Sequence, residues 1–77
     1  MTVDVDKEWS ITVLKEIQTN RNSWMAEGII FKRETPEVIV ATVPGHGTTR
    51  HKAINDAIEN AKDKIFEIKH GFSHPTL

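Results

Sequence analysis

The chain has 77 residues, a formal net charge of -1, four histidines and no cysteine. A chain of this length forms one domain around one small core, and the lack of thiols excludes disulfides, thiolate metal ligands and cysteine nucleophiles. No apolar run approaches the roughly 18 residues that span a bilayer, and a nearly neutral chain has no general attraction for nucleic acid. These features predict a small cytoplasmic protein with no membrane partner.

The first part of the chain predicts a leader followed by one strand. Residues 1–8 are acidic and polar, and we expect a flexible leader there. Apolar and polar side chains alternate over residues 9–18, which predicts a half-buried strand, with Leu14 as the one apolar exception. Residues 19–23 are turn formers and predict a hairpin loop.

Two further strands follow. The second is predicted over residues 24–33, and the connection after it contains Pro36. Residues 38–43 are rich in β-branched side chains and predict a third strand, which we expect to end before Pro44. Three strands joined by short loops predict an antiparallel meander.

Residues 50–69 predict one long amphipathic helix. Its apolar side chains recur at steps of four and three, which places them on one face. They are Ala53, Ile54, Ala57, Ile58, Ala61, Ile65 and Ile68. We expect Gly71 to end the helix in a left-handed conformation. The predicted fold is therefore an α+β domain of β-β-β-α order over residues 9–70, with a C-terminal tail over residues 71–77.

The start of this helix carries basic residues, although helix N-termini are electrically positive and favour acids. The turn and the first helical residues are Gly45, Gly47, Thr48, Thr49, Arg50, His51 and Lys52. Two interpretations fit this pattern. One is an anion site in which free amides and cations bind phosphate or carboxylate, with Arg21 from the first hairpin loop assisting. The other is a solvated turn whose basic side chains point into water.

The second and third strands are apolar on both faces. One helix covers only one face of a three-stranded sheet, so the other is exposed unless something else covers it. The candidates for this interaction face are Met25, Ile29, Phe31, Ile39 and Ala41. Self-association as a homodimer, through the face or through an edge strand, is one outcome. A second is that the acidic leader or the C-terminal tail covers the face. A third is that sheet twist and the stems of Lys32 and Arg33 hide it.

Residues that could carry chemistry do not form a known pattern. His70 and His74 are four apart, but Gly71 and Pro75 interrupt the helix that would bring them together, and no carboxylate or thiolate completes a ligand set. No serine stands in a Gly-x-Ser-x-Gly elbow. We therefore expect no catalytic activity, no metal and no cofactor.

The turn and helix start resemble the C-terminal half of double-stranded RNA binding domains. The last helix of that family opens with Gly-x-Gly-x-Ser, two basic residues and a spaced alanine. The matching residues here are Gly45, Gly47, Thr49, Arg50, His51, Ala53 and Ala57. In that family the basic residues contact phosphates, and the resemblance implies this role for Arg50 and His51.

Residues 40–67 also resemble the HicB-type antitoxins, small proteins with a β-meander followed by a helix. The resemblance is carried by Val43-Pro44-Gly45 and by the helix segment Ala57-Ile58-Glu59-Asn60-Ala61. It implies binding to a toxin partner and oligomerisation. The whole layout is similar to that of many small bacterial and prophage proteins.

Together these patterns predict a small non-catalytic module that binds itself or a protein partner through its sheet surface or an edge. The alternative is a weak nucleic-acid binder that contacts the phosphate backbone through the helix N-terminus.

Overall fold

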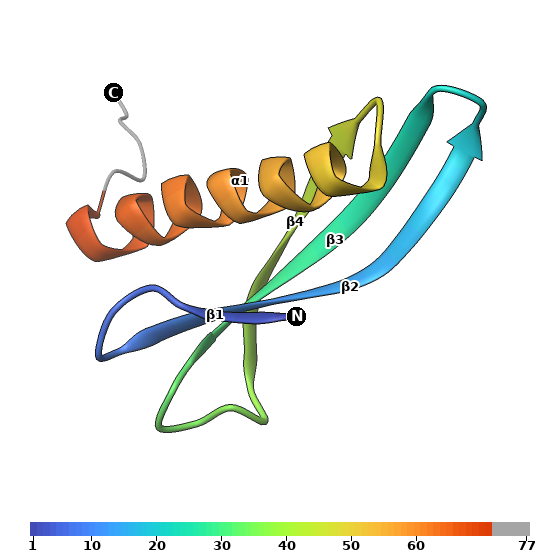
Figure 1. Ribbon diagram of the computed structural model, residues 1–77. Coiled ribbons are helices and arrows are strands. Elements are labelled where there is room, and N and C mark those ends of the chain that lie inside the picture. The colour runs from blue at the N-terminus through green and yellow to red at the C-terminus, as the bar shows by residue number, and fades with distance from the viewer. Residues whose placement is uncertain (72–77) are drawn as a thin grey trace.

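The computed structural model describes residues 1–71, which form an antiparallel sheet with one helix lying across one of its faces (Figure 1). The elements in chain order are β1 (Thr2–Asp4), β2 (Trp9–Asn20), β3 (Ser23–Lys32), β4 (Ile39–Gly47) and α1 (Arg50–His70). Their order in the sheet is β1-β2-β3-β4. The α+β class is confirmed. The prediction of three strands is wrong, because residues 1–71 contain four; residues 72–77 of the predicted tail lie outside the described residues.

The additional strand, β1, lies within the segment where the sequence predicts a flexible leader. It pairs antiparallel with β2, and Val3 lies opposite Ile11. Val13 N–H also donates to the carbonyl of Met1 at 2.9 Å. A strand of three residues is too short to show the alternation from which strands are recognised in a sequence.

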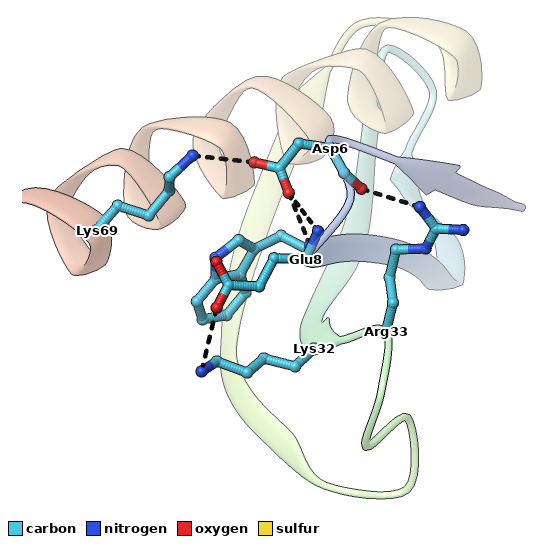
Figure 2. Close-up of polar contacts among 6 residues, drawn as sticks. Asp6, Glu8, Lys32, Arg33 and Lys69 are labelled. Carbon is cyan, nitrogen blue, oxygen red and sulfur yellow. Dashed lines mark hydrogen bonds and ion pairs between the residues drawn. The ribbon is translucent and has the colours of Figure 1, made fainter.

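Asp6 fastens the loop between β1 and β2 to the rest of the fold (Figure 2). Its carboxylate accepts hydrogen bonds from the N–H groups of Glu8 and Trp9 at 2.8 and 2.9 Å, and from Lys69 Nζ at 3.0 Å. Its carbonyl accepts a hydrogen bond from Arg33 Nη1 at 3.1 Å. The Lys69 ammonium, followed by the two N–H groups, holds the pKa of Asp6 below its ordinary value. One side chain thus links this loop to the end of α1.

β4 continues past the predicted end at residue 43. Pro44, Gly45 and Gly47 therefore lie inside a strand, and only Thr48 and Thr49 remain to connect it to α1. A proline is tolerated there because β4 is an edge strand and its outer side has no partner strand that needs an N–H donor.

The glycines of β4 allow α1 to lie directly on the strand. A Cβ atom at Gly45 would lie 2.4 Å from both Ala53 O and Ala57 N, and one at Gly47 would lie 2.6 Å from Ala53 N. The helix residues that meet Gly45 are the alanines Ala53 and Ala57, and those that meet Gly47 are Ala53 and Lys52. The Gly-x-Gly pattern, predicted to be a tight turn, is instead the place where helix and sheet backbones approach each other most closely.

The core is a single layer between the sheet and α1. Its buried apolar residues are Trp9, Ile11, Val13, Ala26, Ile30, Ala53, Ile54, Ala57, Ala61 and Ile65. The predicted helix stripe is thus confirmed for most of its length, but Ile68 at its end is 38% exposed. Trp24 is partly buried against the same core.

Both ends of α1 are capped, and its C-terminal end is capped at Gly71 as the sequence predicts. Thr49 is the N-cap, and its hydroxyl accepts a hydrogen bond from Lys52 N at 3.1 Å. Gly71 is the C-cap, with φ 65° and its N–H bonded to the carbonyl of Glu67. The capping hydroxyl and the left-handed glycine satisfy backbone groups that the helix leaves without partners.

Candidate interaction surface

A bulge in β2 moves an apolar side chain from one face of the sheet to the other. Lys15 has a positive φ of 54°, and the β2–β3 register shifts between Leu14 and Ile17. Leu14 lies opposite Glu27 and Ile17 opposite Met25, so these four side chains share one face. Simple alternation places Ile17 with the buried residues, whereas the bulge brings it to the side of Leu14.

The face that points away from α1 is called the open face here. Its apolar members are Leu14, Ile17, Met25, Ile29, Phe31 and Ile39. Ile39 and Ile17 are 57% and 55% exposed, and Leu14 and Met25 are 42% and 39% exposed. Figure 1 shows α1 on one side of the sheet and no other element of residues 1–71 on the opposite side. The apolar side chains follow a diagonal, from the β2–β3 hairpin to the start of β4.

Four of the five predicted interaction residues lie on the open face, and Ala41 does not. The register pairs Ile30 with Ala41 and Phe31 with Ile39, which leaves Val40 as an extra residue in β4. This irregularity shifts the alternation, so Ala41 packs against the buried core with Ile30. The assignment of Ala41 to the interaction face is therefore wrong.

Two ion pairs lie beside the apolar side chains of the open face. Lys15 Nζ is 3.9 Å from Glu27 Oε1. Arg33 Nη2 is 3.6 Å from Asp4 Oδ2, and the other oxygen of that carboxylate accepts a hydrogen bond from the Ser10 hydroxyl. Both pairs are exposed and contribute little stability, but the opposite charges within each pair leave it with no net charge.

The outer edge of β4 is occupied by side chains of α1. Asn60 Nδ2 donates to the carbonyl of Pro44 at 2.8 Å, and His46 N–H donates to Asp56 Oδ2 at 2.9 Å. Pro44 itself has no N–H to offer. A strand approaching Pro44 and His46 would have to displace both side chains, so this end of the β4 edge is protected against pairing with another chain.

The outer edge of β2 is protected in a different way. β1 pairs with its first part, and the bulge at Lys15 interrupts the strand beyond that point. A bulge and a lysine are both devices that discourage a further strand from adding to a sheet edge. The structure therefore gives the sheet an open face, a short edge strand in β1, and an outer edge of β4 that α1 protects at Pro44 and His46.

The residues predicted to bind an anion are not arranged around one pocket. Gly45 and Gly47 pack beneath α1, and the Thr49 hydroxyl serves as the helix cap. Arg50 forms an ion pair with Glu16, which reaches it from β2. The acid that the first helical turn lacks is thus supplied by a strand, 34 residues earlier in the chain.

The remaining candidates are exposed and spread apart. A shallow depression between the β2–β3 hairpin and the start of α1 is lined by Thr19, Asn22, Ser23, Trp24, His46, Gly47 and Thr48. The side chains of Arg21, Arg50, His51 and Lys52 are not among those that line it. Arg50 and His51 instead border a second hollow with Met1, Glu16 and Ile54.

Sequence reasoning missed Leu14 and Ile17 as members of the open face. The signal was present as the break in alternation at Leu14, Lys15, Glu16 and Ile17. A break of this kind marks a bulge, but it does not say which of the flanking side chains changes face. Glu16 as the partner of Arg50 had no local signal.

Comparisons with protein-family models, with curated proteins and with solved structures find no match to this chain. The resemblances to double-stranded RNA binding domains and to HicB-type antitoxins therefore stay predictions. No helix in the described part of the chain is long and apolar enough to cross a bilayer. Within residues 1–71, no group of three or more histidine and acidic side chains is placed to hold a metal ion.

Proposed function

We propose that this chain is a non-catalytic interaction module that binds a protein partner through the open face. The observation that carries the proposal is the set of six apolar side chains on that face, four of which are between 39% and 57% exposed. Small soluble domains seldom leave a contiguous apolar surface on one side of a sheet without a use for it.

The open face contributes a limited free energy of binding. Fully burying a side chain of this kind contributes about 1.5–3 kcal/mol. Because the four most exposed members are already about half buried, covering the remainder contributes roughly 3–6 kcal/mol in total. Association itself costs at least about 4 kcal/mol in lost freedom of motion. A partner must therefore bring an apolar surface of its own, which roughly doubles the contribution.

Phosphate binding at the helix N-terminus has weaker support than the open face. Arg50 is already paired with Glu16, and Gly45 and Gly47 have no room to admit a ligand beneath α1. Lys52 remains as an exposed cation beside the exposed His51, and a single flexible ammonium attracts phosphate without orienting it.

Site-specific photo-crosslinking tests the proposal. A diazirine amino acid replaces Met25 on the open face, and a second version of the chain carries it at Asp63, an exposed position on α1. After irradiation in cells of the source organism, we expect defined protein adducts from position 25 and none of them from position 63. Equal adduct patterns from the two positions, or none from position 25, would contradict the proposal.

A further inference from the structure

We infer that the partner of the open face is a second copy of this chain, and that two open faces pack sheet on sheet in a symmetric dimer. This inference rests on the proposed function, and it names the partner. Three properties of the surface support it: its charge, its size, and the protection of the sheet edges.

The charges of the open face suit contact with an identical surface. Lys15 pairs with Glu27, and Arg33 pairs with Asp4. When two identical faces meet, an uncompensated charge on one is brought near the same charge on the other, which is repulsive. Internal pairing removes that repulsion. A face evolved for an oppositely charged partner would instead carry an excess of one sign.

The size of the surface matches a second sheet. β2 and β3 contain 12 and 10 residues. With a rise of about 3.3 Å per residue and about 4.8 Å between strands, β2, β3 and β4 together form a sheet face with an area of roughly 500 Å². Stable interfaces bury about 800 Å² per partner, so we expect a reversible dimer. A second copy supplies a face of the same extent, and two sheets pack about 10 Å apart with their strands rotated by about 30°.

The edges direct association to the face. Asn60 and Asp56 cover the outer edge of β4 at Pro44 and His46, and the bulge at Lys15 interrupts β2 beyond its pairing with the short β1. Edge pairing between copies can continue indefinitely, whereas a symmetric contact between two identical faces closes after two copies. The structure therefore favours a dimer over an open assembly.

Analytical ultracentrifugation of the full chain over a range of concentrations tests the inference. We expect a monomer–dimer equilibrium with a Kd between about 10 µM and about 1 mM. Ile17→Lys and Ile39→Lys should each raise the Kd by about tenfold or more, because each places a charge in an apolar contact. Circular dichroism checks that both variants fold, which we expect because both side chains are more than half exposed.

Phe66→Lys is the matched control, because Phe66 is 53% exposed and lies on α1 rather than on the open face. The Kd of this variant should stay within about threefold of the Kd of the unmodified chain. The Kd of the unmodified chain should also change by less than about threefold between low and high salt. A monomer at about 1 mM, or a dimer that neither open-face variant weakens, would overturn the inference. So would a dimer that salt dissociates.

The crosslinking experiment separates failure of this inference from failure of the proposed function. The chain could be monomeric at about 1 mM and still form adducts between position 25 and a different protein. That result would overturn the inference of a dimer, but it would support the proposed interaction module. A monomeric chain with no adducts from position 25 would contradict both.

Discussion

Replacing Gly45 by alanine is expected to lower the free energy of unfolding by about 3 kcal/mol, because the added methyl group has no room beneath α1. Its Cβ would lie 2.4 Å from Ala53 O and Ala57 N, and 2.6 Å from Ala57 Cβ. Ordinary contacts begin near 3.4 Å, so the helix must retreat by about 1 Å, and a gap of that size forfeits up to half of the dispersion energy of each contact. A chain of this length has a total stability of about 4–12 kcal/mol.

The matched control is Gly28→Ala. A Cβ at Gly28 would meet Val43 Cγ2 at 3.3 Å and Ala57 O at 3.4 Å, which small adjustments can accommodate. We expect its cost to be within about 1 kcal/mol, because alanine also reduces the flexibility of the unfolded chain. Both substitutions replace a glycine in a strand by the same residue, so their difference isolates the close approach of α1.

Urea denaturation followed by tryptophan fluorescence and circular dichroism measures both changes. We expect a lower urea midpoint for Gly45→Ala, with the dependence of the unfolding free energy on urea concentration unchanged. A loss below about 1 kcal/mol, or a loss no greater than that of Gly28→Ala, would show that α1 does not rest on β4 as described.

Three further predictions concern single side chains. The pKa of Asp6 is lowered chiefly by Lys69. The Asp6 carboxylate therefore stabilises the fold fully above its ordinary pKa of 3.8, and this stabilisation is lost as the pH falls through the lowered pKa. Asp6→Asn should abolish this part of the acid dependence of stability in pH-resolved urea melts. Trp9→Phe should cost less than about 1.5 kcal/mol in the same assay, because it removes a buried Nε1–H that has no acceptor within residues 1–71, whereas Trp9→Ala should cost about 3 kcal/mol or more. A double-mutant cycle on Arg50 and Glu16 should give a coupling below about 1 kcal/mol that decreases with salt, because the arginine is 63% exposed.

The parts of the fold that could be predicted are those with a long repeating pattern. α1 spans enough turns to show its period, and Thr49 and Gly71 mark its ends with residue types that suit those positions. Both hairpins of the predicted meander were also visible, as one alternating segment and two strongly apolar segments separated by turn formers.

The parts that could not be predicted depend on contacts between distant segments. β1 pairs with β2, and the contact between Asp6 and Lys69 ties the loop after it to the end of α1. The residues around Gly45 are compatible with either a turn or a strand. Only the packing of α1 across β4 decides between the two. In the sequence, the only sign that α1 lies close to β4 was the alanine at two positions of the helix face. Small residues on both the helix and the strand permit their backbones to approach closely.

The open face was predicted in outline and misassigned in detail for the same reason. Alternation places Ile17 on the buried side and Ala41 on the exposed side. Two irregularities, at Lys15 and at Val40, reverse these positions. A shift of one residue exchanges every following side chain between faces, and no local rule states where in a strand it occurs.

Isotope-filtered NMR on an equal mixture of labelled and unlabelled chains tests the role of the open face most directly. At a concentration near 1 mM, contacts between methyl groups of different copies are predicted among Leu14, Ile17, Met25 and Ile39. Contacts between copies that involve only α1 or the outer edge of β4 would contradict the account, as would their absence from a sample that sediments as a dimer.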